Sequence, residues 1–292
     1  MTAYAVATER WELLRALGAI ADAPAAARAA GPALGLEPVS DAEHTGVFVL
    51  NLPPYVSVYL GPDGALGGEG ADRVAGFWRA IGITPPAEPD HLSALLGLYA
   101  SLGEAALDTR RPATTAALAR SQASLFWEHL WPWLPGYTDA VTDLAAPALA
   151  GWARLARRVI AAESRVQRPC PRLPLALRQA PPAPQAQAGL GELTEALTIP
   201  VRSGMILTRR RLALGAGEAG VGHRIGERRF TLRAMLEQDP AATLRWLARE
   251  AGRWQQRHAA RGARDDAGQW WAARAARTRW LLRDCGAGVI RK

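Results

Sequence analysis

The chain has 292 residues, of which 49% are hydrophobic and 21% charged, so its composition is that of a globular protein and excludes a disordered one. No apolar run is long enough to span a bilayer, and Glu9 and Glu12 interrupt the stretch where a signal peptide would need its apolar core. The two cysteines, Cys170 and Cys285, fit neither a disulfide framework nor a zinc site. We therefore expect a cytoplasmic protein without membrane insertion and without a bound metal.

The net charge of +8 comes from the last third of the chain. Residues 1–189 contain 15 basic and 17 acidic residues, whereas residues 190–292 contain 20 basic and 10 acidic residues. Almost every basic residue is arginine, and Lys292 is the single lysine. We interpret the arginines as a solvated helical face and nucleic acid as an improbable partner, although nucleic-acid binding through this region remains the alternative function.

Apolar residues recur at helical spacing along nearly the whole chain. Thr8 is expected to cap a first helix that carries Trp11 and Leu17, and an alanine-rich helix follows Asp22. Residues 47–60 contain the break Pro53-Pro54, which predicts an irregular connection. Further helices are expected around residues 74–81, 89–107, 112–129 and 147–165. The predicted fold class is all-α, a helical bundle.

Six prolines between residues 169 and 191 prevent a regular helix there and indicate a linker or a long surface loop. The expected domains are therefore a helical domain over 1–168, this proline-rich segment over 169–191, and a basic helical region of unknown role over 192–292. In the last region, apolar residues predict helices around 193–197, 205–214, 230–236 and 244–247. Asp239-Pro240 is the expected cap and first turn of one helix, and residues 270–282 form another.

The segment Glu88-Pro89-Asp90-His91 precedes a long apolar stripe. Pro89 suits the first turn of a helix because it has no N–H to leave unpaired, and Asp90 there would lie among free N–H groups. The stripe continues through Leu95 to Leu102 at helical spacing. This pattern predicts an apolar groove with an acidic, polar rim.

A second pattern lies further along the chain: Phe126-x-x-His129-Leu130-x-x-Trp133-x-Pro135-x-Tyr137. Together with Glu88-Pro89-Asp90-His91, it resembles the motifs of the TorD/DmsD type of redox-enzyme maturation chaperone, which read E-P-x-D-H and F-x-x-H-L-x-x-W-x-P-x-F. Tyr137 stands where that family has its final Phe. The likeness extends from Tyr55 to about Trp152 and does not reach the C-terminal region.

The resemblance implies a cofactor-free chaperone, not an enzyme. Such a protein binds the twin-arginine signal peptide, the apo form, or both, of a molybdopterin oxidoreductase and assists cofactor insertion before export. The twin arginines would contact Glu88 and Asp90, and the apolar core of the peptide would lie against Tyr55, Tyr59 and the 92–102 face. The oligomeric state is left open, a homo-oligomer included. The predicted client-binding residues are Tyr55, Tyr59, Glu88, Pro89, Asp90, His91, Leu95, His129 and Trp133.

Catalytic readings of the same residues are weaker. Asp90 and His91 are adjacent, and adjacent side chains on a helix diverge by about 100 degrees, which does not suit a catalytic dyad. His129 is expected to pack within the bundle, and the tryptophans around it fit either a binding surface or a core. An enzyme of unknown class would be favoured only if a metal or cofactor copurified.

The segment Gly215-x-Gly217-x-x-Gly220 spells a dinucleotide-binding fingerprint. That fingerprint requires a preceding strand, and here a helix is expected instead. We therefore interpret these glycines as a loop and expect no cofactor.

Overall fold

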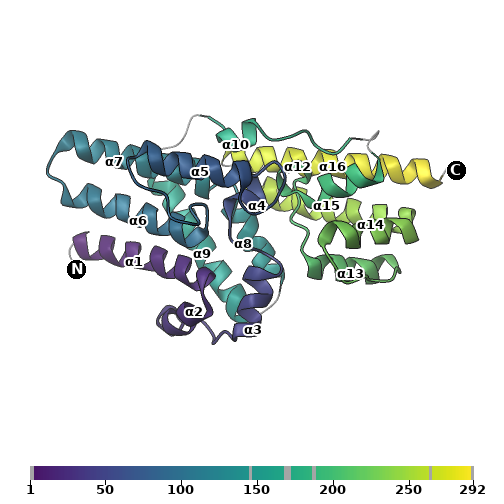
Figure 1. The fold of residues 1–292 in the computed structure, drawn as a ribbon, viewed down its shortest axis with the longest axis horizontal. Helices are drawn as coiled ribbons and strands as arrows, with labels where there is room; N and C mark the ends of the chain where they lie inside the picture. Colours follow the sequence, from purple (N-terminus) through teal and green to yellow (C-terminus); the bar gives the residue numbers. More distant parts are fainter. Residues whose placement is uncertain (1–2, 145–146, 168–171, 186–188, 263–264, 291–292) are drawn as a thin grey trace. The chain divides into compact units, whose positions relative to one another are not determined.

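The computed structural model describes residues 3–144, 147–167, 172–185, 189–262 and 265–290 (Figure 1). Within these ranges the chain forms sixteen α-helices, one 3-10 turn, two π-helical turns and no strand, which confirms the all-α prediction. None of the helices in this part of the chain is long and apolar enough to cross a membrane. Cys170, Pro169 and Pro171, which entered the sequence arguments, lie outside the described residues.

The described residues divide into two compact units. Unit 1 comprises residues 1–58 and 65–174, and unit 2 comprises residues 59–64 and 175–292. The elements of unit 1 are α1 (Ala3–Asp22), α2 (Pro24–Ala30), η1 (Pro32–Leu34), α3 (Asp41–His44), η2 (Thr45–Val49), the start of α4 (Val56–Leu60), α5 (Gly68–Ala80), α6 (Leu92–Asp108), α7 (Pro112–Leu125), η3 (Phe126–Leu130), α8 (Leu134–Asp143) and α9 (Pro147–Val166).

Helix α6 is the centre of unit 1, with α1 and α7 packed beside it (Figure 1). The close approach depends on Gly103 in α6. A Cβ at that position would lie 2.4 Å from the ring of Trp11 in α1 and 2.5 Å from the amide of Gln122 in α7. The three helices therefore meet at a residue without a side chain.

A buried carboxylate joins three helices of unit 1, α1, α6 and α9. Glu163 on α9 is 2% exposed and accepts from Arg10 Nε at 2.5 Å and from the Tyr99 hydroxyl at 2.6 Å. Gln167 in turn donates to the Tyr99 hydroxyl, and Gln122 donates to the Tyr99 carbonyl at 2.9 Å. The buried charge is thus paired and hydrogen-bonded, as buried charges in proteins must be.

Unit 2 is built around two long helices, α15 and α16, which run antiparallel. Its elements are α10 (Leu175–Arg178), α11 (Leu190–Thr198), α12 (Pro200–Ser203), α13 (Arg209–Ala219), α14 (Arg228–Gln238), α15 (Pro240–Gly262) and α16 (Asp266–Ile290). His258 on α15 stacks on Trp271 of α16 with ring centroids 5.6 Å apart, and its Nε2 lies 3.1 Å from the Gly204 carbonyl oxygen. Burial lowers the pKa of His258 to about 3, with Arg261 contributing, so the ring is neutral.

Six residues from the first part of the chain pack into unit 2. Tyr59 is 2% exposed, and burial raises the pKa of its phenol. At the other end of this segment, Gly64 has φ +64, and a Cβ there would lie 3.2 Å from the Ile199 side chain. The hexapeptide 59–64 therefore contributes to the core of a unit whose other residues start at 175.

Several helix boundaries differ from the sequence prediction. Thr8 lies inside α1 and does not cap it, and α6 begins at Leu92 with His91 as its N-cap, so Pro89 is outside the helix. Residues 47–60 are not irregular throughout, because they include part of η2 and all of α4. The proline-rich segment contains the short helix α10, whose Leu177 is 2% exposed. Asp239 does cap α15, accepting from Ala242 N at 2.8 Å.

Candidate functional site

The first motif is held in place by pairing with the chain just before α4. Leu92 N donates to the Pro54 carbonyl at 2.8 Å, and Val56 N donates to the Asp90 carbonyl at 3.0 Å. These two bonds form an isolated antiparallel bridge between Tyr55 and His91. The bridge brings the two rings edge to face, with centroids 4.7 Å apart. Two of the predicted site residues are thus in direct contact.

Asp90 is 3% exposed, and its carboxylate accepts from the backbone N–H of Ser57 at 2.9 Å. Ser57 lies in the first turn of α4, where the backbone N–H groups have no helical partner. Asp90 therefore caps α4, a helix other than the one it precedes in sequence. This position differs from the expectation that it would lie in the first turn of the helix it precedes.

Glu88 is exposed and hydrogen-bonds the hydroxyl of half-buried Tyr55. Burial, followed by the carboxylates of Glu88, Asp90 and Asp22 in that order, raises the pKa of Tyr55 to about 12. Three carboxylates therefore surround one phenol. Pro89 between them is half-buried and accepts a hydrogen bond from Trp78 Nε1 at 3.1 Å, which fixes the turn.

Asp22, at the end of α1, completes this group. Its carboxylate lies 3.6 Å from Nδ1 of His91, and its side chain is 53% exposed. The same Nδ1 accepts from Ser93 N at 3.2 Å, which makes His91 the N-cap of α6. Burial lowers the pKa of His91, whereas Asp22, Glu88 and Asp90 oppose that shift. Asp22 was not predicted as a site residue, because nothing in the local sequence links the end of α1 to residue 91.

The second motif lies in the core of unit 1. His129 is 7% exposed, its ring contacts Phe77 at 5.2 Å, and burial followed by Arg73 lowers its pKa to about 4. Trp133, 2% exposed, donates to the His129 carbonyl at 2.8 Å and packs against Tyr137. The Tyr137 hydroxyl donates to the Leu52 carbonyl at 3.1 Å, three residues before Tyr55. The second motif thus contacts the segment before α4, which in turn pairs with the first motif.

The apolar stripe of α6 is also inside the fold. Leu95 is 0% exposed, and Leu92, Leu96, Tyr99 and Leu102 are each at most 5% exposed. Tyr59 belongs to unit 2, apart from the unit 1 residues with which it was grouped. The structure therefore brings together Tyr55, Glu88, Pro89, Asp90 and His91 at one place. Leu95, His129 and Trp133 are buried away from solvent in the same unit.

The glycine fingerprint is the end of a helix and not a loop, which corrects the sequence interpretation. Gly215 and Gly217 lie within α13, and Gly220, with φ +71, is its left-handed C-cap. A Cβ on Gly215 would lie 2.1 Å from the ring of Trp246, so this glycine makes room for a tryptophan. In the described part of the chain, no group of three or more His, Cys, Asp or Glu side chains is arranged to hold a metal ion.

Comparison with known proteins gives one family. Residues 11–139 match the family described as the nitrate reductase delta subunit, and no curated protein matches the chain. The matched region contains both motifs and Asp22, whereas residues 140–292 lie outside it. Residues 11–139 are thus similar to the nitrate reductase delta subunit family of NarJ/TorD-type molybdoenzyme chaperones, the kind of family that the resemblance implied.

Proposed function

We propose that this protein is a cytoplasmic chaperone that binds the twin-arginine signal peptide, and also the apo form, of a molybdopterin oxidoreductase, and assists cofactor insertion before export. The match of residues 11–139 to this chaperone family supports the maturation role in general. The observation that carries the peptide-binding role is the Tyr55–His91 ring pair between the carboxylates of Glu88 and Asp22.

The chemistry of this pair suits guanidinium groups. Glu88 and Asp22 are exposed carboxylates from two segments, and arginine binds carboxylates through strong, charge-assisted hydrogen bonds. The Tyr55 ring, half-buried between them, offers a face for cation–π contact. Asp90 contributes negative potential, but its hydrogen bond to Ser57 commits it to the fold. Two accessible acids for two adjacent arginines are therefore Asp22 and Glu88.

The apolar part of the peptide needs a surface that is not already buried. Val49 and Leu50, which follow one another at the end of η2, are 61% and 51% exposed and precede Tyr55 in the chain. We propose that they take the contact first assigned to the α6 stripe. In this proposal Leu95, His129 and Trp133 act indirectly, by maintaining the packing around the binding residues, and Tyr59 contributes to the core of unit 2 instead.

The test is fluorescence anisotropy with the full chain and a labelled peptide that contains two adjacent arginines followed by an apolar stretch. Asp22→Asn and Glu88→Gln are expected each to weaken binding roughly tenfold, because each removes one charged acceptor. Glu9→Gln, an exposed acid on α1 like Asp22, is the matched control and should bind as the unchanged protein does. A peptide with glutamines in place of the arginines should show the same loss.

Equal affinity of the arginine and glutamine peptides would overturn the proposal. Equal affinity of the double variant Asp22→Asn/Glu88→Gln and the unchanged protein would remove these two acids from the site. Both variants are expected to keep their unfolding midpoint, since neither carboxylate is buried.

A further inference from the structure

The connection between α13 and α14, residues 221–227, is tied along α14. Gly222 and the side chain of Gln238 exchange two hydrogen bonds of 2.8 and 3.0 Å near the end of α14. Thr231 Oγ1 donates to the Arg224 carbonyl at 3.0 Å, nearer its start. At Gly226 a Cβ would lie 2.9 Å from the ring of Phe230. The connection therefore has a defined path along the helix.

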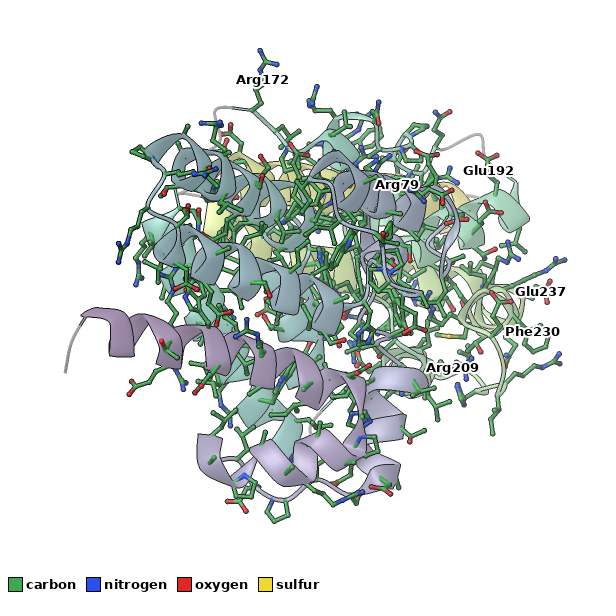
Figure 2. All side chains as sticks on the ribbon, turned by 60° about the vertical axis from the view of Figure 1, so that its left-hand side comes forward. Arg79, Arg172, Glu192, Arg209, Phe230 and Glu237 are labelled. Carbon is green, nitrogen blue, oxygen red and sulfur yellow. The ribbon has the colours of Figure 1, made fainter. Side chains whose placement is uncertain are left out.

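This fixed backbone holds apolar side chains in solvent. Ile225 is 92% exposed, more than any other large hydrophobic residue described, and Phe230 on α14 is 50% exposed. Figure 2 shows Phe230 pointing outward from the ribbon, as does Glu237 on the same helix. Because removing apolar surface from water is favourable, an isoleucine exposed to this degree would gain from a partner that covers it. We refer to Ile225 and Phe230 as the Ile225–Phe230 patch.

Basic residues flank the patch. Residues 221–230 contain three arginines, His223 and a single acid, Glu227. Arg224 is exposed, Arg229 reaches Glu195 at 3.1 Å, and Arg228 donates to the Leu207 carbonyl at 3.2 Å. Arg228 and Arg229 occupy the first turn of α14, where the helix dipole disfavours positive charge. The contacts with the Leu207 carbonyl and with Glu195 account for these two arginines, whereas Arg224 is the exposed arginine beside Ile225.

We propose that the Ile225–Phe230 patch binds an anionic lipid surface. Ile225 and Phe230 enter the boundary between headgroups and acyl chains, and the exposed Arg224 contacts the lipid phosphates. In this proposal the protein binds at the membrane surface and does not cross the bilayer. The patch lies outside the family-matched residues 11–139 and is independent of the proposed peptide site.

Two observations favour a lipid surface over other anionic partners. Single-strand binding usually stacks successive bases on several aromatic rings, whereas the most exposed side chain of this patch, Ile225, is aliphatic and Phe230 is its one aromatic ring. The side chain of Ile225 is 92% exposed and projects from the protein surface. Such a side chain can insert into a lipid interface, where the lipids pack around it. The flanking arginines match the negative charge of that boundary.

The experiment is flotation of the full chain with vesicles of phosphatidylcholine alone or mixed with phosphatidylglycerol. The protein is expected to float with the mixed vesicles and not with the neutral ones, and less well as salt is raised. Ile225→Ser/Phe230→Ser should reduce the bound fraction roughly tenfold, and Arg224→Gln roughly fivefold. Both variants alter exposed side chains and should keep the helical circular dichroism of the unchanged protein.

The matched control is Trp280→Ser. Trp280 on α16 is 68% exposed in the same unit, with Arg277 and Arg283 nearby in sequence, so it is an alternative basic and apolar surface. This variant should float as well as the unchanged protein. A loss of flotation in Trp280→Ser, with none in the double variant, would overturn the assignment to the Ile225–Phe230 patch.

Insertion is measured separately with an environment-sensitive fluorophore at Ile225→Cys in a chain with both native cysteines replaced by serine. A blue shift with the mixed vesicles is expected, and an unshifted spectrum would overturn insertion. Failure of the unchanged protein to float with either vesicle would overturn the proposal as a whole. So would retention of a labelled oligonucleotide that depends on Ile225 and Phe230 in the absence of flotation.

Discussion

The carboxylate of Asp90 accepts the backbone N–H of Ser57 at 2.9 Å, across 33 positions of sequence. Two acids of one motif therefore have different tasks. Asp90 is buried and caps α4, whereas Glu88, two residues earlier, is exposed beside Tyr55. Loss of the Asp90 side chain should therefore destabilise the site, whereas loss of the Glu88 side chain should leave the site folded and change what it binds.

Asp90→Ala is expected to lower the free energy of unfolding by roughly 1–3 kcal/mol, because the Ser57 N–H is left buried without an acceptor. Glu88→Ala should change it by less than about 0.5 kcal/mol, as is usual for exposed side chains. Urea unfolding followed by circular dichroism measures both. Equal stability of the two variants would contradict the capping role of Asp90.

Gly103→Ala is expected to destabilise unit 1 by roughly 1–3 kcal/mol, because the added methyl overlaps the ring of Trp11. Gly97→Ala is the control on the same helix, where a Cβ meets nothing within 4 Å. That change should raise stability, by up to about 1 kcal/mol, through helix propensity alone. Thermal unfolding of the two variants side by side should therefore shift in opposite directions.

Glu163→Ala should cost roughly 3–5 kcal/mol, because it leaves Arg10 and the Tyr99 hydroxyl without their buried acceptor. Glu104 forms a comparable pair with Arg15 at 2.6 Å, but its side chain is 36% exposed. Glu104→Ala should cost less than about 1 kcal/mol. If chemical denaturation gave the two variants similar losses, burial would not be what distinguishes these pairs.

Acid should destabilise both units through their buried histidines. The pKa values of His258 and His129 are lowered to about 3 and about 4 from an ordinary 6.5, mainly by burial. Between pH 6.5 and these values the unfolded chain binds a proton that the folded chain does not, so the free energy of unfolding falls as pH falls. The stability they contribute is fully present above pH 6.5.

His258→Leu replaces one titrating group with an apolar side chain. The urea midpoint of unit 2 should then depend less steeply on pH below 6.5 than in the unchanged protein. His223→Leu, which changes an exposed histidine in the same unit, is the control and should keep the original slope. An unchanged slope in His258→Leu would show that other groups cause the acid sensitivity.

Features that depend on local chemistry were predictable from the sequence. The helix expected over 147–165 is observed as Pro147–Val166, and Asp239 caps α15 as its position before Pro240 indicated. Thr8 was misassigned because helical residues precede it, which the short apolar pattern did not reveal. The two spaced motifs pointed to the family that matches residues 11–139.

Features that depend on distant residues were not predictable. Pro89 suits the start of a helix. However, the backbone of Asp90 and Leu92 pairs with Val56 and Pro54, and α6 begins only at Leu92. The sequence pattern around Gly215 does not reveal why a glycine is needed there. In the structure, a side chain at this position would overlap the ring of Trp246. From its sequence, the apolar stripe of α6 could line either an open groove or a core. In the structure, helices α1 and α7 pack against α6, and the stripe is buried in the core.

The hexapeptide 59–64 has a consequence for biosynthesis. It leaves the ribosome more than a hundred residues before the rest of unit 2, starting at Leu175, has been made. Until then the phenol of Tyr59 lacks the folded unit in which it is buried, so the nascent chain carries a water-exposed tyrosine. A fragment ending at residue 168 would therefore retain residues 59–64 without the core to which they contribute.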